Sequence, residues 1–142
     1  VPLTNEEKKA FLRRFKAMNR RIDQTRIEIA RLEDIGTHIT PQYTDMPKGT
    51  GNSNKIQKVA VEIVQLKEEL EEQKSEALTV RSQIKEVLND LQDDDLRDLL
   101  WYHYICDLNW GEVAKKMHYD LHYIYALHKK ALKQLKIPKY DT

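Results

Sequence analysis

Apolar residues near the start of the chain recur at alternating intervals of four and three, with polar residues between them. Thr4 and Glu7 have the spacing of a capping box, which marks the beginning of a helix. The apolar seam that follows is Phe11, Phe15, Met18, Ile22, Thr25, Ile29 and Leu32. This heptad spacing predicts a long helix that packs on a partner through one narrow stripe. Gly36 is its expected stop.

A second long helix is predicted to begin near Asn54, because the same rhythm continues from there to Leu91. Its seam is Ile56, Val59, Ile63, Leu66, Leu70, Gln73, Ala77, Val80, Ile84, Val87 and Leu91. Residues 36–53 between the two helices contain prolines and glycines that argue against regular structure, so we expect a loop there. The two helices are expected to fold back on each other as an antiparallel hairpin, because one helix cannot bury such a stripe alone.

The second seam is longer than the first, so a simple hairpin leaves part of it uncovered. A second copy of the chain would cover that part, and we expect residues 1–92 to be a dimerisation device rather than a plain spacer. The residues expected at the contact are Ile63, Leu66, Leu70, Ala77, Val80 and Ile84. Gln73 interrupts the apolar seam and is a candidate for fixing its register.

Residues 93–142 are predicted to form a separate domain of three shorter helices. Three aspartates from Asp93 suit the start of the first helix, which is expected from Leu96 to Tyr104 with an inward face of Leu96, Leu99, Leu100 and Tyr104. Asn109 and Glu112 have capping-box spacing at the start of the second helix, expected from Trp110 to Met117.

Asp120 is the expected cap of the third helix, which runs through Leu135 and stops before Pro138. Only the turn at His118 and Tyr119 separates it from the helix before, so the two are predicted to form a helix-turn-helix. The fold class expected for the whole chain is therefore all-α, with a long antiparallel hairpin followed by a three-helix domain.

The third helix of that domain has two distinct faces. Its expected inward residues are Ile124, Leu127, Ala131 and Leu135, and its outward stripe is His122, Ala126, Lys129, Lys133 and Lys136, flanked by Tyr123, Tyr125 and Lys130. Such a helix suits duplex DNA, with its first turns in the major groove and its later lysines along phosphates. Lys115 and Lys116 could add phosphate contacts. The plainer alternative is a solvated face whose lysines only suit the helix dipole.

Charge is distributed unevenly, although the chain as a whole carries a formal net charge of only +1. Seven lysines and one aspartate lie between Lys115 and Lys139, whereas four of the six residues from Asp93 to Asp98 are aspartates. The near-neutral total therefore hides a basic face that could meet a polyanion.

Other classes of site find little support in the sequence. Cys106 is the single cysteine, which fits a reducing cytoplasm, and we expect it to be a buried, inert thiol on an apolar helix face. The five histidines lack the spacing of a zinc site, and the Gly-containing segment KGTGNSNK lacks the spacing of a phosphate loop. No apolar run approaches the ~20 residues of a membrane span. We therefore expect no enzyme, cofactor, metal or membrane partner.

The segment from Leu99 to Leu135 reads LLWYHYICDLNWGEVAKKMHYDLHYIYALHKKALKQL, which resembles region 4 of bacterial sigma factors. Together with the hairpin and the loop ITPQYTDMPKGTGNSNK, the whole chain resembles a family of phage and prophage proteins from Gram-positive bacteria. Its layout is similar to the ArpU and RinA groups of phage regulators, of which the latter activate late-gene transcription. The resemblance implies a regulator in the cytoplasm of a bacterial host, with duplex DNA and host RNA polymerase as partners.

This chain departs from the family pattern at the reading helix. The pattern has Ser at the cap and Arg in the next positions, where this chain has Asp120, Leu121, His122 and Ala126. Contacts to phosphates, the N-terminal arginines (Arg13, Arg14, Arg20 and Arg21) or a protein partner would then matter more. Two other classes stay open: a packaging factor resembling a small terminase subunit, and a protein adaptor that never touches DNA.

Overall fold

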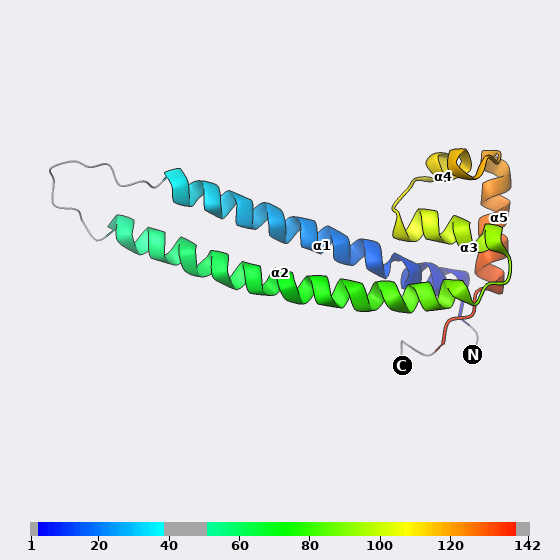
Figure 1. The fold of residues 1–142 in the computed structure, drawn as a ribbon, viewed down its shortest axis with the longest axis horizontal. Coiled ribbons are helices and arrows are strands. Elements are labelled where there is room, and N and C mark those ends of the chain that lie inside the picture. Colours follow the sequence, from blue (N-terminus) through cyan, green and yellow to red (C-terminus); the bar gives the residue numbers. More distant parts are fainter. Residues whose placement is uncertain (1–2, 39–50, 139–142) are drawn as a thin grey trace. The chain divides into compact units, whose positions relative to one another are not determined.

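The structure is a computed structural model that describes residues 3–38 and 51–138 (Figure 1). These residues form five α-helices and one π-helical turn: α1 (Asn5–His38), α2 (Gly51–Asn89), α3 (Asp94–Leu100), η1 (Trp101–Ile105), α4 (Trp110–Met117) and α5 (Leu121–Gln134). No strand occurs among them, so the predicted all-α class is confirmed. Within this described part, no helix has the length and apolar character that crossing a membrane requires.

The chain divides into two compact units. The first unit is Val1–Met18 with Ala77–Thr142, and the second unit is Asn19–Glu76. This division differs from the boundary expected between residues 92 and 93, because the first turns of α1 and the last turns of α2 belong with the three C-terminal helices. The physical reason is a shared core, which is described below.

In the second unit, α1 and α2 run antiparallel (Figure 1). The Glu33 carboxylate of α1 lies 3.6 Å from Lys67 Nζ of α2, while Gly36, later in α1, faces Val59, earlier in α2. The predicted seam points inward, with Ile22, Thr25 and Ile29 buried and Leu32, Val59, Ile63, Leu66 and Leu70 half-buried. The Thr25 hydroxyl donates to the Arg21 carbonyl oxygen at 3.1 Å, which satisfies its one polar group inside the seam.

The ends of the hairpin helices differ from the prediction. Gly36 does not stop α1, since no glycine of the described residues has the positive φ of a left-handed cap, and the helix continues to His38. The helix α2 begins at Gly51, three residues before the expected Asn54. The predicted loop is therefore shorter at both ends, and residues 39–50 lie outside the described residues.

The core of the first unit joins the two ends of the chain. It contains Phe11, Leu12, Val80, Ile84, Val87, Leu88 and Leu91 from the hairpin helices and the link after them, together with apolar residues of α3, η1, α4 and α5. Leu12 lies off the predicted seam yet is fully buried, because α1 here turns a second face toward the C-terminal helices. Lys8 Nζ of α1 also donates to the Leu132 carbonyl oxygen of α5 at 2.7 Å.

This core changes the expected dimer contact. Ala77, Val80 and Ile84 are buried in a single chain. Val80 and Ile84 belong to the core of the first unit, so a second copy would reach these two only by opening that core. The dimer contact of these three residues therefore stays a prediction. Ile63, Leu66 and Leu70 are half-buried, which keeps them available to a partner.

The expectation that Cys106 is buried was wrong. The predicted helix from Leu96 is present as α3 and η1, but the wider π-helical turn ends it at Ile105 and leaves Cys106 as an exposed cap. The next residue, Asp107, has a left-handed backbone with φ of 61°. Partial burial raises the pKa of the Cys106 thiol, so exposure does not make it a ready nucleophile.

Replacing Leu12 with Ala tests whether α1 belongs to the core of the C-terminal helices. We expect the free energy of unfolding to fall by about 2–5 kcal/mol, the usual result of truncating a fully buried leucine. Urea unfolding followed by circular dichroism measures it. The matched control is Ile27→Ala in the same helix, whose side chain is 54% exposed. Equal, small losses in both variants would contradict this packing.

Candidate nucleic-acid interface

Helix α4 is held at both ends by hydrogen bonds, of which the sequence predicted the capping box at its start. Asn109 Oδ1 accepts from the Glu112 amide at 2.8 Å, and Glu112 Oε1 accepts from the Asn109 amide at 3.0 Å, which completes the capping box. At the other end His118 takes a left-handed conformation, φ 60° and ψ 40°, and the Tyr119 amide donates to the Ala114 carbonyl at 3.0 Å. The chain therefore turns sharply after α4.

Helix α5 begins directly after this turn. Asp120 Oδ2 accepts from the His122 amide at 3.1 Å, as the capping prediction requires. The predicted inward residues Ile124, Leu127, Ala131 and Leu135 are buried, as is Leu132, which the prediction had omitted. Val113 and Ala114 of α4 are buried in the same core. The helix-turn-helix arrangement follows from these caps and inward faces.

The opposite face of α5 is free of the core. All nine residues that the sequence proposed for DNA contact are exposed: Lys115, Lys116, His122, Tyr123, Tyr125, Ala126, Lys129, Lys130 and Lys133. His122, Ala126, Lys129 and Lys133 follow one another at intervals of three or four residues, so they form one stripe along the helix. Lys115 and Lys116 lie in the last turn of α4, just before the turn.

Two tyrosines border this stripe on its two sides, and each contacts a different neighbour. The Tyr123 ring lies edge-on to Tyr119 at 4.8 Å, and the Tyr119 hydroxyl donates to Asp95 Oδ2 at 2.6 Å. That hydrogen bond raises the pKa of Tyr119, and the charge of Asp95 adds to the effect. On the other side, the Tyr125 ring lies edge-on to Trp110 at 6.3 Å. Both tyrosines are thus partly positioned before any partner binds.

A cluster of four rings, which the sequence analysis did not anticipate, lies where η1, α4 and α5 meet. It consists of His103, Tyr104, Trp110 and His128, called here the ring cluster. The His103 ring stacks on Trp110 with centroids 3.7 Å apart and an angle of 13°, and His128 lies 4.4 Å from Trp110. Tyr104 Oη lies 2.8 Å from His128 Nε2, and His103 Nδ1 lies 2.8 Å from the Leu108 carbonyl oxygen.

The histidines of the ring cluster are held in their neutral form. Burial, together with the smaller effects of His103, Lys9 and Arg13, lowers the pKa of His128 to about 4. Burial also lowers the pKa of His103, against the hydrogen bond to Leu108, and raises the pKa of Tyr104 to about 12. At neutral pH His103 therefore donates from Nδ1 to the carbonyl oxygen, which can only accept, and the Tyr104 hydroxyl shares a hydrogen bond with His128 Nε2. Apart from the alternating aromatic residues around it, the sequence offered no signal for this cluster.

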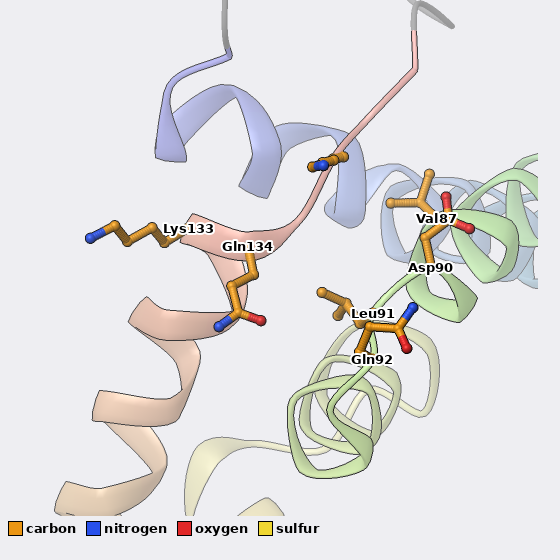
Figure 2. Close-up of a pocket in the computed structure, with 7 residues that line it drawn as sticks. Val87, Asp90, Leu91, Gln92, Lys133 and Gln134 are labelled. Atoms are coloured by element: carbon orange, nitrogen blue, oxygen red, sulfur yellow. The ribbon is translucent and has the colours of Figure 1, made fainter.

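A metal centre and a small-molecule pocket are the two other kinds of site that the described residues could form. Within residues 3–38 and 51–138, no three His, Cys, Asp or Glu side chains converge as a metal site would need. A pocket lies between the end of α2 and the end of α5, lined by Val87, Asp90, Leu91, Gln92, Lys133, Gln134 and Lys136 (Figure 2). In Figure 2 the Lys133 side chain points away from Leu91 and Gln92, so its charge faces solvent.

Lowering the pH should destabilise the fold through His128. An unfolded histidine titrates near 6.5, whereas folded His128 titrates at about 4, so the unfolded chain takes up the proton first. The contribution of His128 to the free energy of unfolding is therefore fully present above pH 6.5 and is lost as the pH falls toward 4. We expect a loss of about 1 kcal/mol between pH 7 and pH 5 after allowance for partial exposure.

The matched variant for this prediction is His128→Gln, whose amide oxygen can still accept from Tyr104 but cannot titrate. Urea unfolding at the two pH values should show a smaller difference in this variant, with the remainder from His103. An equal pH dependence in both proteins would contradict the assignment.

No curated protein and no solved structure matches this chain at a significant level. One family model does, that of a protein of unknown function (DUF1492), and it covers residues 38–136. The match includes all of α2, the three shorter helices and the stripe on α5. Since it extends over more than half of the 142 residues, the chain belongs to the DUF1492 family.

Proposed function

We propose that this protein is a DNA-binding transcriptional regulator of phage or prophage genes, which places α5 in the major groove of duplex DNA. The observation that carries the proposal is the outward face of α5. Its core-facing residues hold it against α4, while polar, aromatic and lysine side chains of the opposite face are all exposed. A helix-turn-helix presents its second helix to DNA in this way.

The distribution of side chains along α5 suits a division between reading and anchoring. His122, Tyr123 and Tyr125 lie in the first turns and can exchange hydrogen bonds with base edges, and Ala126 can contact a thymine methyl. Lys129, Lys130 and Lys133 lie in the later turns, where a phosphate backbone would pass. Helix α5 contains no arginine for a bidentate contact to guanine. Phosphate contacts therefore carry more of the affinity in this proposal.

The second unit would pair two copies of the chain. Half-buried Ile63, Leu66 and Leu70 keep part of the seam open, and a second hairpin would cover it as a symmetric dimer. Two helix-turn-helix units would then meet half-sites separated by one or more helical turns of DNA. The likeness to sigma region 4 and to the ArpU and RinA regulators supports a role at promoters in a bacterial host's cytoplasm, with RNA polymerase as a further partner. That role requires no cofactor and no catalysis.

A protein adaptor is the second candidate, and one observation favours it. The start of α5 exposes Leu121, Tyr123 and Tyr125 at 38%, 48% and 46%, and Tyr119 beside them at 37%. Exposed aromatic and leucine side chains in one place suit a protein partner as well as bases. An adaptor would bind polymerase or another regulator through this end of α5 and would not bind DNA.

Removing two lysines of the stripe tests the DNA proposal. Engagement of six of the seven lysines would give a slope of about −5 for log affinity against log salt, since each phosphate contact contributes about −0.9. Lys129→Ala combined with Lys133→Ala should weaken binding to all sequences alike and reduce the slope by about two. Fluorescence anisotropy of labelled 30-bp duplexes over a salt series measures both.

The matched control is Lys58→Ala with Lys85→Ala, two exposed lysines of α2. This control should bind as the wild type does. Unchanged affinity in the Lys129/Lys133 variant at about 100 mM salt would contradict the phosphate role, and a wild type that binds no duplex would favour the adaptor.

The oligomeric state tests the role of the hairpin. Light scattering after size-exclusion chromatography should give the mass of a dimer for the wild type and of a monomer for Leu66→Glu, because a charge cannot be buried in an apolar contact. Ala60→Glu, exposed on the same helix, is the control and should stay dimeric. Circular dichroism must show that Leu66→Glu stays helical. A monomeric wild type would contradict the dimer, and a ring-sized mass would favour the packaging factor.

A further inference from the structure

Helix α1 carries a row of basic side chains within the first unit. Lys9, Arg13 and Lys16 are four and three residues apart, so they lie on one face of the helix. Arg13 and Lys16 are exposed and Lys9 is half-buried. The row spans about 10 Å along the helix axis at 1.5 Å per residue.

The basic row borders the ring cluster. Lys16 Nζ lies 2.9 Å from Asp107 Oδ1, which fixes α1 beside the link between η1 and α4. His103 is within electrostatic range of Lys16 and Arg13, and His128 is within range of Lys9 and Arg13. All three basic side chains of the row therefore approach one or both of the histidine rings.

The ring cluster in turn connects the basic row to the outward face of α5. Trp110 lies 4.4 Å from His128 on one side and 6.3 Å from Tyr125 on the other, and Tyr125 flanks the stripe with His122 and Lys129. Because both histidines are neutral, the positive charge next to the stripe on this side comes from α1. The half-buried rings of Trp110 and His128 thus lie between the stripe and the basic row.

The other side of the stripe has the opposite charge. There Tyr123 contacts Tyr119, which is hydrogen-bonded to Asp95, and Asp93 and Asp94 stand at the start of the same helix α3. Aspartates repel a phosphate backbone, so a polyanion that lies along the stripe gains by extending toward α1 and loses by extending toward α3. The charge distribution therefore favours extension toward α1, where Arg13 adds its charge to Lys9 and Lys16, whose ion-pair partners are Glu6 at 3.2 Å and Asp107 at 2.9 Å.

We propose that Lys9, Arg13 and Lys16 form a second phosphate-binding row, which holds the DNA backbone beside the major groove that α5 enters. This inference rests on the proposed function and adds a contact surface from the opposite end of the chain. With phosphates about 3.4 Å apart along the axis of each strand, a 10 Å row can follow about three of them. Half-buried Trp110 and exposed Tyr125 would face the sugars between the two sets of contacts.

The variant Arg13→Gln tests the row, since it removes one charge from an exposed side chain and keeps a polar group there. Loss of one phosphate contact should reduce the salt slope by about 0.9, which corresponds to about eightfold weaker binding at 0.1 M salt. The probe is a labelled 30-bp duplex of random sequence, measured by anisotropy over a salt series. The matched control is Arg26→Gln, an exposed arginine of the same helix on the opposite face, which should keep the wild-type slope.

The charge reversal Arg13→Glu should weaken binding more than Arg13→Gln does, with the thermal unfolding midpoint unchanged in both. Wild-type slope and affinity in both Arg13 variants would overturn the second row while leaving the proposed function intact. Equal losses in the Arg13 and Arg26 variants would also overturn it, because they would indicate only a diffuse effect of net charge. A wild type that binds no duplex would instead remove the proposed function on which the inference rests.

Discussion

The burial of Leu12 and Phe11 against the C-terminal helices is the contact on which the rest of the molecule depends. Helices α3, α4 and α5 together have fewer than 50 residues, and a chain of that size buries too little apolar surface to be stable without help. The first turns of α1 and the last turns of α2 supply the missing surface. The helix-turn-helix is thus completed by both ends of the hairpin.

This arrangement explains why the outward face of α5 is well defined. Asp120 fixes where α5 begins, His118 fixes the direction in which the chain leaves α4, and the core fixes how α5 is rotated about its axis. With these three constraints met, His122, Ala126, Lys129 and Lys133 must point outward together. A surface that binds a polyanion needs this kind of positioning, since lysines held in a fixed row engage phosphates at a lower entropic cost.

Local spacing was enough to predict much of this fold. The caps at Asn109 and Asp120 and the inward faces of α4 and α5 depend on residues within one or two turns, so the sequence shows them directly. Leu12, Cys106 and the ring cluster could not be predicted in the same way. The burial of Leu12 depends on residues more than 60 positions away, and the exposure of Cys106 depends on a π-helical turn that no residue pattern announces. The predicted helix stop at Gly36 was wrong because a glycine near a helix end does not have to adopt the left-handed conformation.

The hydrogen bond from Lys8 to the carbonyl of Leu132 joins residues 124 positions apart in the chain. A helix-turn-helix that packs on such distant segments has a high contact order, and its folding is correspondingly slow. During synthesis the start of α1 is made before α5. Phe11 and Leu12 therefore lack their full core until α5 has left the ribosome. A fragment made of the three C-terminal helices alone would lack the surface that closes their core. In this protein the helix-turn-helix consequently completes its core only after α5 has been made.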